Sequence, residues 1–128
     1  MLQQVALAVG LIVLGTHVCS STFVDIDKNM PPFTVCVEFA VFQFNEQQED
    51  EFAYKFLRVR RSQRQKLTWI YLMDVEMGRT ICKKHDEDID NCPLQEGEGE
   101  KMVRCTFIVD AKPWNFQYTI LKSNCTKN

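Results

Sequence analysis

The side chains best suited to chemistry gather in one acidic stretch, His85 to Asn91 (HDEDIDN), which lies between Cys82 and Cys92. Alternating aspartates can bind Ca²⁺, a histidine between two cysteines can bind Zn²⁺, and a histidine beside a carboxylate can act as a general base. Each of these chemistries needs further features that the neighbouring sequence must supply.

The acidic stretch lacks the features that either metal site needs. Asp86, Asp88 and Asp90 alternate, but the glycine at the sixth position and the glutamate at the twelfth position of an EF-hand loop are missing, and we predict no flanking helices. A zinc site made by the histidine and the two cysteines would compete with a disulfide, which export favours. We therefore expect a solvated acidic loop that binds no metal and no cofactor.

Catalysis by this stretch is also disfavoured. His85 is the only histidine after residue 20, and it follows Cys82 by three positions. Nothing apolar surrounds the carboxyl groups of residues 86–90 to raise a pKa and make a general acid. A lone surface histidine is the simpler interpretation, so we expect that the chain is not an enzyme.

The first twenty residues have the character of a signal peptide. Val5 to Gly15 is an uninterrupted apolar run that is short for a membrane span, and Val18, Cys19 and Ser20 offer small residues for cleavage. We expect residues 1–20 to be removed and residues 21–128 to form one secreted domain without a membrane span.

Charge and cysteine usage agree with an exported domain. The 15 basic and 17 acidic residues all follow residue 20, so no global charge draws the chain to nucleic acid or a membrane. A small exported fold is typically stapled by disulfides. Neighbours along the chain would pair Cys82 with Cys92 and Cys105 with Cys125, although spacing alone does not fix the connectivity.

Two polar features are candidate surface sites. Asn124-Cys125-Thr126 is a sequon for N-linked glycosylation near the end of the chain. A basic cluster can contact sulfated glycans, although a charged strand edge that discourages strand pairing is the favoured interpretation. The cluster comprises Arg58, Arg60, Arg61, Arg64 and Lys66, and the first three are the candidate glycan contacts.

One long helix is predicted early in the chain. Thr34 is a suitable N-cap, and Phe39 and Phe42 widen an apolar stripe that should pack deeply against a sheet. Cys36 lies between this stripe and the polar side, so an inert, half-buried free thiol is the default and a reactive or dimer-forming thiol is the alternative. From Phe33 onward the stripe continues with Val37, Ala40, Val41 and Phe44.

The segment before the helix, residues 21–33, shows no periodicity. Pro31-Pro32 forbids helix there and favours an extended lead-in. We expect a mobile arm, in which a short strand can precede the helix.

Four strands are predicted after the helix. Residues 52–61 change their apolar parity midway, which indicates a bulge or an early end to burial, and residues 62–66 form a turn. Residues 103–109 and 116–120 alternate as strands joined by a turn at 112–115. The pattern predicts an α+β fold, with an antiparallel sheet against one helix. The strand after residue 66 carries an apolar residue at every second position: Leu67, Trp69, Tyr71, Met73, Val75 and Met77.

Several of these segments together resemble the type 2 cystatins. They are VEFAVFQFN (37–45), MDVEMGRTIC (73–82), DNCP (90–93) and the Pro113-Trp114 pair before a last strand that ends in Cys125. The resemblance implies the cystatin fold, in which an antiparallel sheet of about five strands wraps around one long α-helix. It also implies the disulfides Cys82–Cys92 and Cys105–Cys125.

Inhibitory cystatins block papain-like cysteine proteases with a wedge of three parts: a glycine-bearing arm, a first hairpin loop reading Gln-x-Val-x-Gly, and a second loop carrying Pro-Trp. Pro113-Trp114 matches the second loop. The first loop aligns with Gln65 to Trp69, which keeps the glutamine, replaces valine by Leu67 and places Trp69 where glycine permits close approach. The arm contains no glycine.

The resemblance therefore implies a secreted inhibitor with weak or absent action on papain-like proteases, in the divergent reproductive-tract (cystatin 9/12-like) subgroup. Glu49 stands where legumain-inhibiting cystatins carry asparagine. The alternative is a non-inhibitory extracellular binding or self-assembling module that uses the basic cluster or Cys36. Because the strand alternation starts inside the aligned first loop, we expect Leu67 and Trp69 to extend the sheet or form another contact surface.

Overall fold

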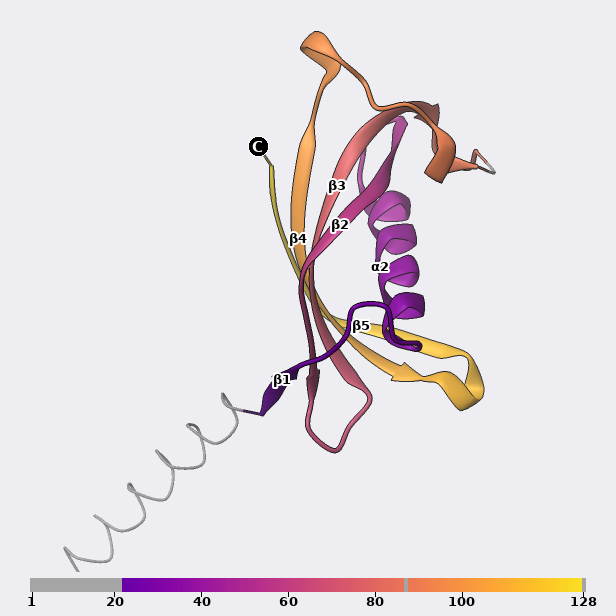
Figure 1. The fold of residues 1–128 in the computed structure, drawn as a ribbon. Helices are drawn as coiled ribbons and strands as arrows, with labels where there is room; N and C mark the ends of the chain where they lie inside the picture. The colour runs from indigo at the N-terminus through magenta and orange to yellow at the C-terminus, as the bar shows by residue number, and fades with distance from the viewer. Residues whose placement is uncertain (1–21, 87, 128) are drawn as a thin grey trace, which may run out of the picture.

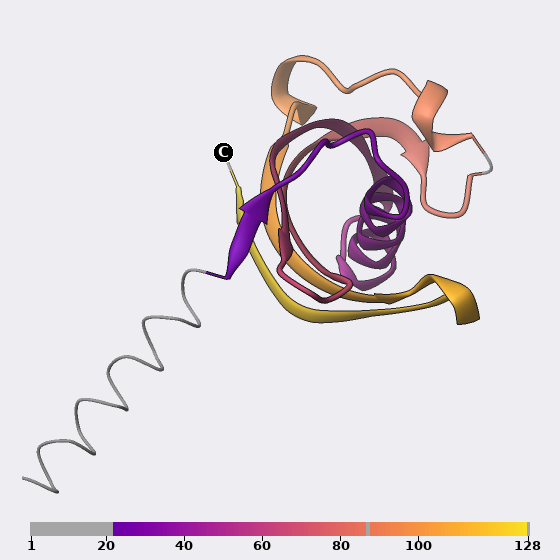
Figure 2. The same cartoon turned by 60° about the horizontal axis from the view of Figure 1, so that its bottom comes forward.

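The computed structural model describes residues 22–86 and 88–127, so the expected signal peptide lies outside the described residues. In this part of the chain, five strands form one antiparallel sheet in the order β1-β2-β3-β4-β5. The sheet curves around the single helix α2, as predicted (Figure 1, Figure 2). None of the described helices is long and apolar enough to cross a membrane. The elements are β1 (Phe23–Asp25), α2 (Phe33–Gln47), β2 (Phe52–Gln65), β3 (Ile70–Lys83), β4 (Met102–Lys112) and β5 (Gln117–Lys127).

Helix α2 packs against the concave face of the sheet, and its buried side chains meet those of β3 and β4 in one core. The ring of Phe33 packs edge-on against that of Tyr71, with the centroids 5.9 Å apart. Two details of the predicted helix were wrong. It begins at Phe33 after Pro32, with no side-chain cap from Thr34. Phe42 is 57% exposed, because a residue nine positions after Phe33 is about two and a half turns away and faces outward.

Cys36 is also placed differently from the prediction. Its thiol is free but fully buried in the core rather than half-buried. Burial raises the pKa of Cys36 to about 12, so the thiol stays protonated and unreactive at neutral pH. Complete burial also leaves no surface sulfur for a disulfide between two copies. The expected pairs Cys82–Cys92 and Cys105–Cys125 are both disulfides in the structure.

Strand β2 contains the predicted irregularity, since its register with β3 shifts at Phe56/Arg58 and again at Val59/Arg61. It continues to Gln65, however, so the turn covers residues 66–69 rather than 62–66. Leu67 and Trp69 therefore do not extend the sheet, so the first of the two expected alternatives was wrong. Their apolar character continues the alternation of β3, although the chain is already turning there. The second alternative, another contact surface, stays a prediction.

The arm before the helix is partly a strand. Phe23 pairs with Gln65 and Asp25 pairs with Gln63, so β1 adds to the end of β2. The expectation of a mobile arm was wrong for these residues, whereas the short strand before the helix is confirmed.

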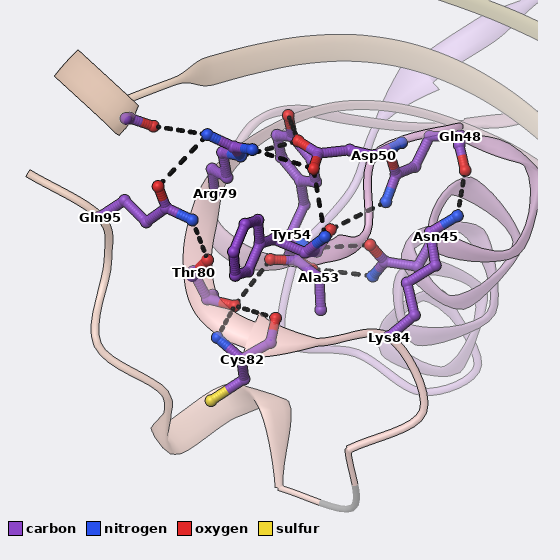
Figure 3. Close-up of polar contacts among 12 residues, drawn as sticks. Asn45, Gln48, Asp50, Ala53, Tyr54, Arg79, Thr80, Cys82, Lys84 and Gln95 are labelled. Atoms are coloured by element: carbon purple, nitrogen blue, oxygen red, sulfur yellow. Dashed lines mark hydrogen bonds and ion pairs between the residues drawn. The ribbon is translucent and has the colours of Figure 1, made fainter.

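A polar network joins the exit of α2 to strands β2 and β3 (Figure 3). The Asp50 carboxylate accepts hydrogen bonds from Arg79 Nη2 at 3.0 Å, from the Phe52 N–H at 3.1 Å and from the Tyr54 hydroxyl at 3.0 Å. Arg79 also bonds Gln95 and stacks over Phe52, with its guanidinium 4.8 Å from the ring centroid. The network fixes the end of the sheet opposite the β2–β3 turn.

The Asp50 network predicts acid sensitivity. Burial alone acts to raise the pKa of Asp50, but the hydrogen bonds from Arg79, Phe52 and Tyr54 outweigh it and lower the pKa to about 2. The folded state therefore favours the carboxylate. Its contribution to the free energy of unfolding is present above about pH 4 and is lost as the pH falls towards 2. Urea unfolding across this range should show a shallower decline for Asp50→Asn than for the unaltered chain. Glu96→Gln, at an exposed carboxylate, should keep the full decline.

Candidate protease-binding edge

The turn between β2 and β3 is closed by the Thr68 hydroxyl and by a backbone hydrogen bond from the Thr68 N–H to the Gln65 carbonyl at 3.3 Å. Thr68 Oγ1 donates to the carbonyl of Gln65 at 2.9 Å and accepts from the N–H of Ile70 at 3.1 Å. Leu67 adopts a left-handed backbone conformation with φ of 61°, which costs a branched residue about 1–2 kcal/mol. This geometry leaves the Leu67 side chain fully exposed at the tip of the turn.

The turn between β4 and β5 is built around a short 3-10 helix, Pro113–Asn115. Phe116 follows it in the left-handed conformation with φ of 52°, and its N–H bonds the Pro113 carbonyl at 3.3 Å. Trp114 is 61% exposed and Phe116 is 86% exposed. Phe116 was predicted to open the last strand, but β5 begins only at Gln117, so this exposed ring is a site residue that the sequence analysis missed.

The two turns contact each other. The indole rings of Trp69 and Trp114 meet edge to face, with centroids 6.0 Å apart and an interplanar angle of 72°. The N–H of Ala111 also donates to the carbonyl of Trp69 at 2.9 Å. An aromatic pair of this geometry adds about 0.5–1.5 kcal/mol beyond its buried area. The two turns therefore form one continuous surface, which we call the hairpin edge: Leu67, Trp69, Pro113, Trp114 and Phe116.

The N-terminal strand enters beside this surface. The N–H of Lys66 donates to the carbonyl of Thr22 at 3.0 Å. The side-chain amide of Gln65 also reaches the Thr22 hydroxyl, at 3.4 Å. The structure thus brings both aligned loops and the start of the arm to one end of the sheet, where all five predicted protease-binding residues lie (Figure 1).

The acidic loop is held by a disulfide and by hydrogen bonds within the loop. Cys82, Asp86 and Cys92 lie close together, but the two sulfur atoms are bonded to each other with an S–S distance of 2.01 Å. The disulfide uses the thiolates that a zinc site would need. The Asp88 carboxylate accepts two hydrogen bonds from the side-chain amide of Asn91, at 2.9 and 2.8 Å.

The basic cluster is partly neutralised by acidic residues on β3. Arg58 and Arg60 both pair with Glu76, the latter at 3.0 Å. The hydrogen bond from Arg58, followed by that from Arg60, lowers the pKa of Glu76. Arg104 pairs with Asp74 at 2.6 Å on the same face of the sheet. Glu76 therefore offsets one of the five positive charges of the basic cluster, since Arg104 lies outside the cluster.

The family model for the cystatin domain matches residues 21–114, and the chain therefore belongs to the cystatin family. This is a family of protease inhibitors and not of enzymes. The chain is 61% identical to Cystatin-12 of Mus musculus, with 99% of both chains covered, and 58% identical to Probable cystatin-15 of Bos taurus, with 98% of both covered. These relatives fit the predicted type 2 subgroup.

The fold is similar to that of solved cystatins. A crystal structure of dimeric human cystatin F matches with a TM-score of 0.72 and 27% identity, over 81% of this chain and 85% of that one. A tick gut cystatin, Mialostatin of Ixodes ricinus, matches with a TM-score of 0.61 and 20% identity, over 83% of this chain and 98% of that one. The cystatin fold predicted for the chain is confirmed.

Proposed function

We propose that the protein is a secreted cystatin whose hairpin edge contacts papain-like cysteine proteases but inhibits them weakly or not at all. The observation that carries this proposal is the packing of Trp69 against Trp114. An inhibitory edge must be thin enough to fill a protease cleft. Here an indole occupies the position at which the inhibitory first loop has glycine, so the edge is widened where the two turns meet.

The exposed apolar surface of the edge supports a role in binding. Leu67, Trp114 and Phe116 all expose large apolar side chains at the same end of the sheet. Contiguous apolar surface of this kind marks protein interaction sites. The same observation favours the second candidate function, a non-inhibitory extracellular binding module of the reproductive tract.

Titration of papain with the protein tests the proposal. We expect papain to keep more than about half of its activity at roughly micromolar protein, which corresponds to a binding free energy weaker than about 8 kcal/mol. Any residual inhibition should disappear in Trp114→Ala. Stoichiometric inhibition at about nanomolar protein would show that the widened edge still fits the cleft.

The titration should use protein collected from the medium of transfected mammalian cells, because the same preparation addresses the secretion proposal. Its mass should correspond to a chain that starts near Ser21. The two disulfides support export.

Asn124 is an exposed residue of β5 opposite Thr106, which supports glycan attachment there. Contact of sulfated glycans with Arg58, Arg60 and Arg61 also remains a proposal, and retention on heparin tests it.

A further inference from the structure

A groove of about 900 Å³ runs between α2 and β2, away from the hairpin edge. Its lining residues include none from either hairpin turn among the residues described. Phe42 on the helix and Phe56 on the strand are both exposed to solvent within it. Exposed aromatic rings in a concave surface are typical of a binding site. The other apolar lining residues are Val37, Val41, Leu57, Val59 and Ile89.

Strand β2 presents an open side to this groove. Within the described residues, β1 covers β2 only at Gln63–Gln65, and residues 55–61 pair on one side alone, with β3. Tyr54, which lies next to this open stretch, shows how a partner strand would bind the backbone of β2. The side-chain amide of Asn45 binds both the carbonyl and the N–H of Tyr54, each at 2.8 Å, as the backbone of a neighbouring strand would (Figure 3). Among the described contacts, no side chain binds the backbone of residues 55–61 in this way.

The groove is acidic at one end. Three cationic residues line the groove. Arg58 and Lys84 are engaged elsewhere, with Glu76 and with the carbonyl of Gln48. Lys28 precedes the start of α2, whereas the acidic end lies beside its last turn. His85 Nδ1 lies 3.8 Å from Glu46. A cationic group on an occupant would therefore be favoured at this end. The carboxylates that line it are Glu46, Asp86, Asp88 and Asp90, and Glu38 lies farther along the helix.

We propose that this groove binds an extended peptide with apolar side chains at alternate positions and Lys or Arg at one end, which adds a strand to the open side of β2. The backbone of the peptide would form hydrogen bonds with the N–H and carbonyl groups on the open side of residues 55–61. Every second side chain of the peptide would enter the groove over Phe42 and Phe56. The cationic end would meet the carboxylates of the acidic loop. A stretch of this length accommodates about six peptide residues, or roughly 20 Å.

Fluorescence anisotropy with labelled peptides tests the proposal on the folded protein. The probes are Val-Thr-Ile-Thr-Val-Lys-Lys and its reverse, Lys-Lys-Val-Thr-Ile-Thr-Val, because the strand can add in either direction. We expect one of them to bind in the micromolar range, and the counterpart with Glu in place of Lys to bind at least about tenfold more weakly. Added salt should reduce this difference.

Variants locate the bound peptide. Phe42→Ser should weaken binding about tenfold without unfolding the chain, because the ring already faces solvent. Asp86→Asn combined with Asp90→Asn should weaken binding of the basic peptide and strengthen binding of the Glu counterpart, because two negative charges are removed. The matched control is Leu121→Ser on β5, at a residue that is 54% exposed and far along the sheet, which should bind like the unaltered protein.

Four results would overturn the proposal. The first is that neither basic peptide binds at about 1 mM. The second is that Phe42→Ser and Leu121→Ser bind the peptide equally well. The third is that a peptide N-methylated at alternate amides binds as well as the unmethylated one, which would indicate a site for amphiphiles rather than strand addition. The fourth is dimerisation in sedimentation experiments that Phe42→Ser abolishes, which would identify a second copy as the occupant.

Discussion

The Trp69→Gly variant is expected to inhibit papain at least about tenfold more tightly than the unaltered chain, a difference of about 1.4 kcal/mol in binding free energy. The substitution removes the indole that packs on Trp114 and leaves Gln65 and Leu67 in place. It therefore thins the hairpin edge where the two turns meet. Trp114 loses an edge-to-face contact of about 0.5–1.5 kcal/mol but gains freedom to enter the cleft.

Lys66→Gly is the matched control for this experiment, because it places a glycine in the same turn without removing the indole. It should leave papain inhibition unchanged. Adding Trp114→Ala to Trp69→Gly should abolish the gain, since the second turn would then lose its only indole. If Trp69→Gly inhibits no better than Lys66→Gly, the width of the edge does not limit binding and the proposed cause of weak inhibition is wrong.

Asn45→Ala is expected to lower the free energy of unfolding by roughly 2–4 kcal/mol. Asn45 is 8% exposed, and its side chain satisfies both backbone groups of Tyr54. Alanine can replace neither hydrogen bond, so a buried N–H and a buried carbonyl lose their partners. Urea unfolding monitored by circular dichroism measures the loss.

Two further variants separate this effect from a general weakening of the helix. Asn45→Asp keeps an acceptor for the N–H of Tyr54 but provides no donor for its carbonyl, so an intermediate loss is expected. Glu46→Ala changes the exposed neighbour and should alter the free energy of unfolding by no more than about 0.5 kcal/mol. A loss for Asn45→Ala as small as that for Glu46→Ala would show that the Tyr54 backbone finds other partners.

The regular parts of the fold could be predicted because their signals are local. Alternation over β3 and β4 and the helical spacing from Phe33 each arise from one element burying one face. The turn at 66–69 could not be predicted in the same way. Leu67 and Trp69 continue the alternation, whereas the hydrogen bonds of Thr68 to Gln65 and the left-handed conformation of Leu67 show that the chain has left the sheet.

The candidate site could be predicted in part, through the resemblance of two short motifs to the loops of cystatins. Their contact could not, because Trp69 and Trp114 are far apart in the sequence. The pairing of Ile70 with Asp110 sets their proximity, since it aligns the end of β4 with the start of β3. Phe116 was assigned to a strand because its apolar character matches that of Tyr118 and Ile120, although its backbone belongs to the turn.

The contact between the two turns also allows intrinsic tryptophan fluorescence to report on the hairpin edge. Trp69 and Trp114 are the only tryptophans in the chain, and both lie in the hairpin edge. The intrinsic tryptophan emission of the protein therefore comes from that surface alone. Docking of a partner on the edge, or separation of the two turns, alters this emission without any attached dye, while a ligand in the groove beside α2 leaves it unchanged.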